Sequence, residues 1–108
     1  MVEDAATVTL SWRGVAYLGG AAGVGQRAVA EATLDAIEQV TDGRVQADLV
    51  AVAATDLGPS KVAMAQLTLR DSGSRLVGSA IVREDSLEVA TVRAVLDAVN
   101  RTLALHLD

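Results

Sequence analysis

Two residue types that enzymes often use for chemistry are absent or rare in the chain. It has no cysteine and one histidine in 108 residues. Without cysteine, disulfides, thiolate catalysis and cysteine-ligated zinc are excluded. No serine, threonine or lysine stands at a recognisable spacing from a histidine or carboxylate partner, so the sequence offers no nucleophile. We therefore expect no catalytic residue, no cofactor and no metal site.

Basic residues and long apolar runs are also scarce. Nine Lys and Arg against fourteen Asp and Glu give a net charge of −5, which repels phosphate backbones and argues against a nucleic-acid partner. No uninterrupted apolar run approaches the ~20 residues of a membrane span, so no membrane partner is expected. Residues 1–4 are acidic and do not resemble a secretory signal, which predicts a cytoplasmic protein.

Aromatic residues make up only 2% of the chain, namely Trp12 and Tyr17, whereas hydrophobic residues make up 51%. A core of alanine and valine predicts layers that approach closely and leave only small internal pockets. So much apolar content in a small domain favours burial at a subunit interface. We expect a homo-oligomer, a dimer or larger.

The first half of the chain predicts a hairpin and a helix. Apolar and polar residues alternate over residues 7–17, and a two-residue turn at Arg13-Gly14 would pair Trp12 with Val15 and Leu10 with Tyr17. A glycine-rich segment leads into a helix over residues 26–40, and Gly43 can end it in the left-handed conformation.

The second half predicts three strands, over residues 46–54, 61–70 and 75–83, and a helix over 85–106. A Ser72-Gly73 turn would place Leu69 opposite Leu76. Asp85 is the expected N-cap, with Glu88 three residues later. The order ββαβββα predicts an α+β two-layer sandwich: a largely antiparallel five-stranded sheet with both helices on one face.

The two helices share a sequence phrase. Residues 32–37 (Ala-Thr-Leu-Asp-Ala-Ile) are echoed by residues 94–99 (Ala-Val-Leu-Asp-Ala-Val), each after a glycine-bearing hairpin. We interpret residues 1–108 as one domain with a pseudo-repeat, about 7–43 and 44–108. The alternative is that a common helical phrase arose twice by chance.

Two groups of residues are candidates for binding. One face of the predicted sheet is too apolar for solvent and predicts the oligomer interface at Val62, Met64, Val77 and Ile81. Backbone N–H groups near the helix starts could receive a small anionic ligand, and an aromatic pair on the hairpin could stack on one. These ligand candidates are Gly23, Gly25, Asp85, Ser86, Trp12 and Tyr17. The alternatives are a strand-to-helix hinge for the glycines, helix capping for Asp85 and core filling for the aromatic pair.

Residues 86–100 resemble one family. The run Ser-Leu-Glu-Val-Ala-Thr-Val-Arg-Ala-Val-Leu-Asp-Ala-Val-Asn is similar to a helix of the form Asp-Ile-x-x-Ala-Ser-x-x-Ala-x-x-x-Ala-x-Asn. That helix belongs to the C-terminal regulatory domain of 2-isopropylmalate and citramalate synthases. The family's Gly-Asn-Gly-Pro before the first helix corresponds here to residues 23–26, which keep both glycines. The resemblance covers about two-thirds of the chain, without the catalytic barrel of those enzymes.

The resemblance implies a non-catalytic domain that pairs subunits and binds an end-product amino acid. We therefore expect a regulatory, allosteric domain of amino-acid biosynthesis that binds a small metabolite between its halves or subunits. The alternatives are a structural assembly protein that docks a partner without a ligand and, third, a small enzyme with an oligomeric cleft that uses carboxylates.

Overall fold

The chain begins with the predicted hairpin. The computed structural model describes residues 4–83 and 86–106. Strands β1 (Ala5–Trp12) and β2 (Val15–Ala22) pair Trp12 with Val15 and Leu10 with Tyr17, as expected. Arg13 and Gly14 both have positive φ, 52° and 79°, which is the turn geometry that suits the twist of a two-residue hairpin.

Helix α1 (Gly25–Val40) follows the hairpin and ends three residues before the predicted glycine, which lies in the turn that follows. Gly43 has φ of 78°, and its N–H donates to the Glu38 carbonyl at 2.8 Å. Thr41 also secures this end, because its hydroxyl donates to the Ile37 carbonyl and accepts the N–H of Val45 at 3.1 Å. The helix therefore turns directly into the next strand.

Strands β3 (Ala47–Leu57), β4 (Ser60–Leu69) and β5 (Arg75–Ile81) form an antiparallel meander, and α2 (Leu87–His106) follows. The predicted register of β4 and β5 is wrong by two residues, since Leu67, not Leu69, faces Leu76. The connecting loop is longer than a two-residue turn: Leu69 N–H donates to the Ser74 carbonyl, and Gly73 N–H donates to the Leu69 carbonyl. A shift of two keeps each side chain on its predicted face.

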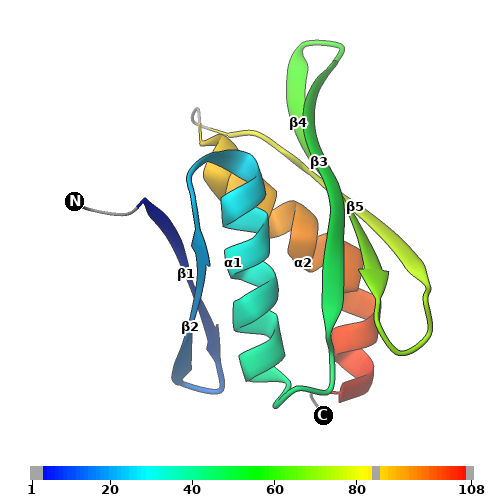
Figure 1. Cartoon of the computed structure of the whole chain (residues 1–108). Coiled ribbons are helices and arrows are strands. Elements are labelled where there is room, and N and C mark those ends of the chain that lie inside the picture. Colours follow the sequence, from blue (N-terminus) through cyan, green and yellow to red (C-terminus); the bar gives the residue numbers. More distant parts are fainter. Residues whose placement is uncertain (1–3, 84–85, 107–108) are drawn as a thin grey trace.

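The α+β class and the order ββαβββα are confirmed, but the five strands form two sheets, β1–β2 and β3–β4–β5. The helices lie between these sheets rather than on one face of a single sheet (Figure 1). The main core joins both helices to the larger sheet through Leu34 and Ile37 of α1, Leu67 of β4, and Val95 and Val99 of α2. The β3–β4 hairpin extends beyond the helices (Figure 1).

Side chains from the helices explain why the sheets stay apart. In β2, the backbone groups of Leu18 and Gly20 point away from β1. Asp35 of α1 accepts the Gly20 N–H at 2.9 Å, and Gln39 donates to the Leu18 carbonyl at 2.6 Å. The side chains of Asp35 and Gln39 thus bond the outer edge of β2, where a further strand would otherwise pair.

Strand β5 and helix α2 repeat the arrangement of β2 and α1. Asp97 of α2 accepts the N–H of Ser79 on the outer edge of β5 at 3.0 Å. The strand glycines repeat as well: a Cβ at Gly19 would overlap backbone and side-chain atoms of Ala32 and Ala36, and a Cβ at Gly78 would overlap backbone atoms of Ala94 and Ala98. Each helix thus lies directly against a strand glycine. Within the described residues, no helix is long and apolar enough to cross a membrane.

Candidate functional site

The predicted ligand residues at the helix starts have different surroundings. Gly23 and Gly25 have positive φ, 103° and 90°, so both need the freedom of glycine. The Gly23 N–H is engaged, because it donates to the Asp4 carbonyl at 2.9 Å. Val24 is the N-cap of α1 and provides no side-chain hydrogen bond. The first turn of α1 therefore carries backbone donors without a side-chain cap.

The start of α2 is capped. Ser86 Oγ accepts the Val89 N–H at 3.1 Å, so the serine does the work expected of Asp85. Asp85 itself lies outside the described residues. Because its hydroxyl is engaged with its own helix, Ser86 has a structural role here.

Tyr17 lies far from the start of α1. Tyr17 lines an open hollow with Asp35, Gln39 and Asp42, beside the C-terminal end of α1. The Arg13 guanidinium lies 5.3 Å from the centre of the Trp12 ring. Since the 16 residues of α1 span roughly 24 Å, the structure does not bring Tyr17 together with Gly25.

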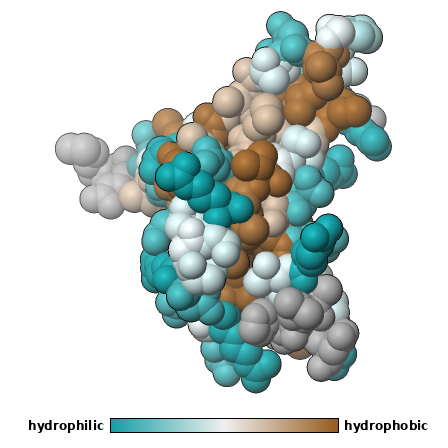
Figure 2. Space-filling view, turned by 90° about the vertical axis from the view of Figure 1, so that its right-hand side faces the viewer, coloured by the Kyte–Doolittle hydropathy of each residue, from teal (hydrophilic) through white to brown (hydrophobic). Residues whose placement is uncertain are grey.

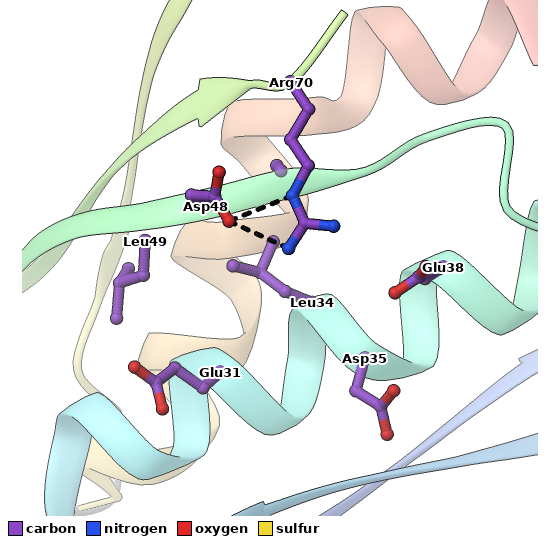
Figure 3. A pocket seen from close by; sticks show the side chains of 8 residues that line it. Glu31, Leu34, Asp35, Glu38, Asp48, Leu49 and Arg70 are labelled. Atoms are coloured by element: carbon purple, nitrogen blue, oxygen red, sulfur yellow. Dashed lines mark hydrogen bonds and ion pairs between the residues drawn. The ribbon is translucent and has the colours of Figure 1, made fainter.

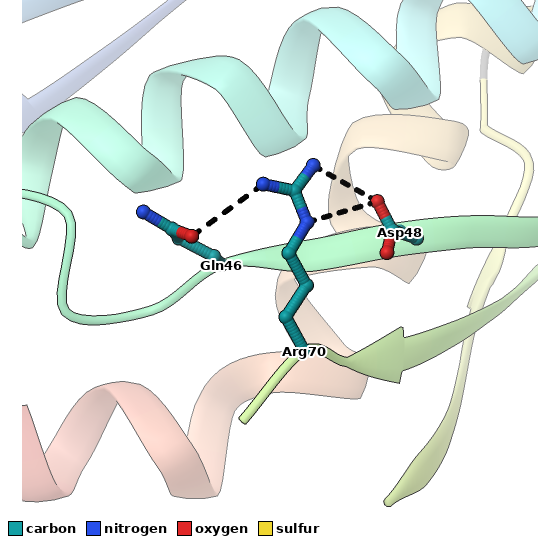
Figure 4. Close-up of polar contacts among 3 residues, drawn as sticks. All are labelled: Gln46, Asp48 and Arg70. Atoms are coloured by element: carbon teal, nitrogen blue, oxygen red, sulfur yellow. Dashed lines mark hydrogen bonds and ion pairs between the residues drawn. The ribbon is translucent and has the colours of Figure 1, made fainter. Parts of the chain in front are cut away.

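A polar hollow lies between α1 and β3 and has a volume of about 250 Å³. Glu31 and Glu38 of α1 lie across it from Arg70, whereas Asp35 points away toward β2 (Figure 3). Arg70 donates to Asp48 Oδ1 from Nε at 3.1 Å and from Nη2 at 2.9 Å, and Nη1 lies 3.4 Å from Gln46 Oε1 (Figure 4). The hydrogen bond and charge of Asp48 raise the pKa of Arg70 above its ordinary value.

This hollow was not foreseen from the sequence, because Asp48 of β3 and Arg70, the residue after β4, stand 22 positions apart. Their opposite charges become neighbours only once the β3–β4 register is fixed. Arg70 is satisfied within the chain by Asp48 and Gln46. No group of three or more acidic, histidine or cysteine side chains among the described residues is placed to hold a metal ion.

The outer face of the β3–β4–β5 sheet, away from the helices, carries the predicted interface residues. Met64, Val77 and Ile81 have exposed fractions of 36%, 62% and 50%. Val62 differs from expectation: it is buried, with an exposed fraction of 9%, between Thr55 and Ile81 of the neighbouring strands. The sequence did not predict the part that β3 plays here, where Ala51 and Ala53 line an apolar hollow of about 280 Å³ with Met64, Gln66 and Val77.

Figure 2 shows apolar residues on this side of the molecule, from the projecting β3–β4 hairpin to the middle of the view. Comparison of the chain with protein-family models, with curated proteins and with solved structures gives no match. A functional proposal therefore depends on the residues of this chain.

Proposed function

We propose that this chain is a non-catalytic regulatory domain that works as a homo-oligomer assembled through the outer face of β3–β4–β5. A comparison within the chain supports the proposal. Hairpins β1–β2 and β4–β5 are equivalent in register: Ala5 pairs with Ala22 where Val62 pairs with Ile81, and Thr7 pairs with Gly20 where Met64 pairs with Ser79.

The outer faces of these two hairpins differ at three positions. The β1–β2 hairpin carries Ala5, Thr7 and Ala22 where the β4–β5 hairpin carries Val62, Met64 and Ile81. A fourth position is alike, because exposed Leu18 of the first hairpin corresponds to exposed Val77 of the second. The first hairpin shows that this arrangement of strands forms with small or polar residues at the three differing positions. Val62 is already buried within the chain, but Met64 and Ile81 are partly exposed and are larger than the fold requires. Burial of these two side chains against another molecule, at ~25 cal/mol per Å², accounts for them.

The resemblance of residues 86–100 to the regulatory domain of 2-isopropylmalate and citramalate synthases supports the same class of function. It extends the proposal to a small metabolite, an amino acid or keto acid, for which the uncapped first turn of α1 is the candidate site. The alternative function is a structural assembly protein that binds no ligand. This alternative uses the same apolar face for assembly. An enzyme ranks third, because the sequence offers no nucleophile at a recognisable spacing from a histidine or carboxylate partner.

Met64→Asp tests the assembly. A carboxylate at the centre of an apolar contact would lose its hydration, so the variant should be monomeric at a concentration where the wild type is oligomeric. Thr7→Asp, at the equivalent position of the first hairpin, should leave the oligomer intact. Light scattering after size-exclusion chromatography measures both. A monomeric wild type at micromolar concentration would remove the proposal.

A further inference from the structure

We infer that the β3–β4–β5 face binds the same face of a second copy, about a twofold axis that runs along β4 between the two sheets. The inference rests on the proposed function and specifies its partner and geometry. Three uncharged rows of side chains, aligned by strand register, lie next to one another on the face, and the row that follows, Asp48, Thr68 and Arg75, carries charge on β3 and at the start of β5. The three uncharged rows are Ala51, Gln66 and Val77; Ala53, Met64 and Ser79; and Thr55, Val62 and Ile81.

No side chain in these rows is charged, although the chain has a net charge of −5. The three rows offer no opposite charge to a basic or acidic partner. A charged side chain of such a partner would lose its hydration at this face without gaining an ion pair, which costs free energy. The same face of a second copy is uncharged and apolar in the same way. Two copies can therefore meet here while their carboxylates stay in water.

The three rows of one copy are also complementary in size to the three rows of a second copy that is rotated by a half turn about an axis along β4. Such a rotation places β5 of each copy over β3 of the other, with the strands aligned as in packed sheets. Val77 of one copy then lies over Ala51 of the other, where the hollow of about 280 Å³ is found. In another row Ile81 lies over Thr55. In these two rows a larger side chain on β5 thus faces a smaller one on β3.

Gln66 supplies the polar contact in this arrangement. Its side-chain amide makes no hydrogen bond to the described residues, and it stands on the central strand between Ala51 and Val77. On a twofold axis, two Gln66 amides meet, and each donates an N–H to the carbonyl of the other. The only side-chain amide in the three rows thus forms its hydrogen bonds with the same amide of the second copy.

The size of the face is that of a small contact. The three rows cover five residues of β4, Val62 to Gln66, or roughly 17 Å at ~3.3 Å per residue, and three strands at ~4.8 Å spacing are about 14 Å wide. The projected area of the rows is therefore on the order of 250 Å² per copy. That is below the ~800 Å² per partner of a standard interface, so the contact belongs among weak interfaces.

Opposite charges introduced at Gln66 test whether the two Gln66 side chains meet on the twofold axis. Gln66→Glu alone and Gln66→Lys alone each place like charges together and should weaken the dimer by about tenfold or more. An equimolar mixture should restore association through heterodimers, measured by sedimentation velocity. The same two substitutions at Thr9, the equivalent position of the first hairpin, should have no effect alone or mixed.

A second mixture tests which strands face each other. Val77→Glu should be rescued by a chain carrying Ala51→Lys but not by a chain carrying Val77→Lys, because the axis along β4 places Val77 over Ala51. Circular dichroism of each variant confirms its folding. A covalent check uses the absence of native cysteine: Gln66→Cys should give a covalent dimer with a short bis-maleimide, whereas Thr9→Cys should not.

The outcomes separate the two proposals. Rescue in both mixtures together with the Gln66→Cys cross-link supports the inference. An oligomeric wild type without rescue at Gln66 overturns the twofold arrangement and leaves the proposed assembly function standing. A wild type that remains monomeric overturns both.

Discussion

The carboxylate of Asp35 accepts a hydrogen bond of 2.9 Å from the backbone N–H of Gly20, and Asp97 does the same for Ser79 at 3.0 Å. Both aspartates occupy the fourth position of the repeated helical phrase. The bond joins the middle of a helix to the outer edge of the strand that it covers. This pair of contacts yields the first prediction.

Asp97→Ala should lower the free energy of unfolding by about 1–2 kcal/mol, because the backbone N–H of Ser79 loses an ionised acceptor. Urea denaturation measures the change. Arg93→Ala, on the same helix and exposed, is the matched control and should change stability by less than about 0.5 kcal/mol. Equal effects of the two substitutions would show that the edge contact contributes nothing of its own.

Gly78→Ala should destabilise the fold by about 3 kcal/mol or more, since its Cβ would overlap backbone atoms of Ala94 and Ala98 and force α2 away from β5. Gly19→Ala should lower stability by a similar amount, because its Cβ would overlap atoms of Ala32 and Ala36 in α1. The control is Gly20→Ala, where the nearest atom to a Cβ is the Ala6 carbonyl oxygen at 3.8 Å, an ordinary contact. Thermal and urea unfolding of the three variants check this ranking, and a stable Gly78→Ala would contradict the close approach.

Association should depend little on salt and, if it changes, should strengthen as salt is added. The proposed contact is uncharged, whereas each copy carries a net charge of −5, so screening weakens only the repulsion between copies. Sedimentation velocity at low and high ionic strength measures the dissociation constant. A dimer that weakens tenfold in high salt would point to an interface held by ion pairs on another surface.

A branched-chain amino or keto acid should raise the melting temperature if the first turn of α1 receives its carboxylate. Ligand at 100 times its Kd adds ~2.7 kcal/mol of stability. Gly25→Val should abolish the shift, because φ at this position is 90° and a β-branched residue disfavours it. Differential scanning fluorimetry of both chains, each with and without ligand, separates loss of binding from loss of stability. A shift that persists in Gly25→Val would move the site elsewhere.

Local turn chemistry explains which parts of the fold were predictable. The register of the first hairpin follows from Arg13-Gly14, since a two-residue turn fixes every pair beyond it. The second register was missed because the Ser72-Gly73 signal lies inside a longer loop closed between Leu69 and Ser74. The period of two still placed Met64, Val77 and Ile81 on the outer face.

The division into two sheets was not predictable from local patterns. It depends on Asp35 and Asp97 reaching strand edges 15 and 18 positions away, which no alternation of apolar residues encodes. The irregular register between Leu49 and Ala51 similarly brings Ala51 to the outer face beside Gln66. The polar hollow at Arg70 was missed for the same reason, since Arg70 follows β4 and its partner Asp48 lies on β3.

The aspartate contacts at Gly20 and Ser79 also limit where a further strand can pair with this chain. A continuous cross-β filament needs every sheet to accept a strand on both sides. In each sheet here, one outer edge already donates a backbone N–H to an aspartate of the helix that covers it, at β2 in one sheet and at β5 in the other. A strand that adds to the opposite edge of either sheet leaves this helix-bonded edge in place. The geometry therefore opposes continuous growth by strand pairing.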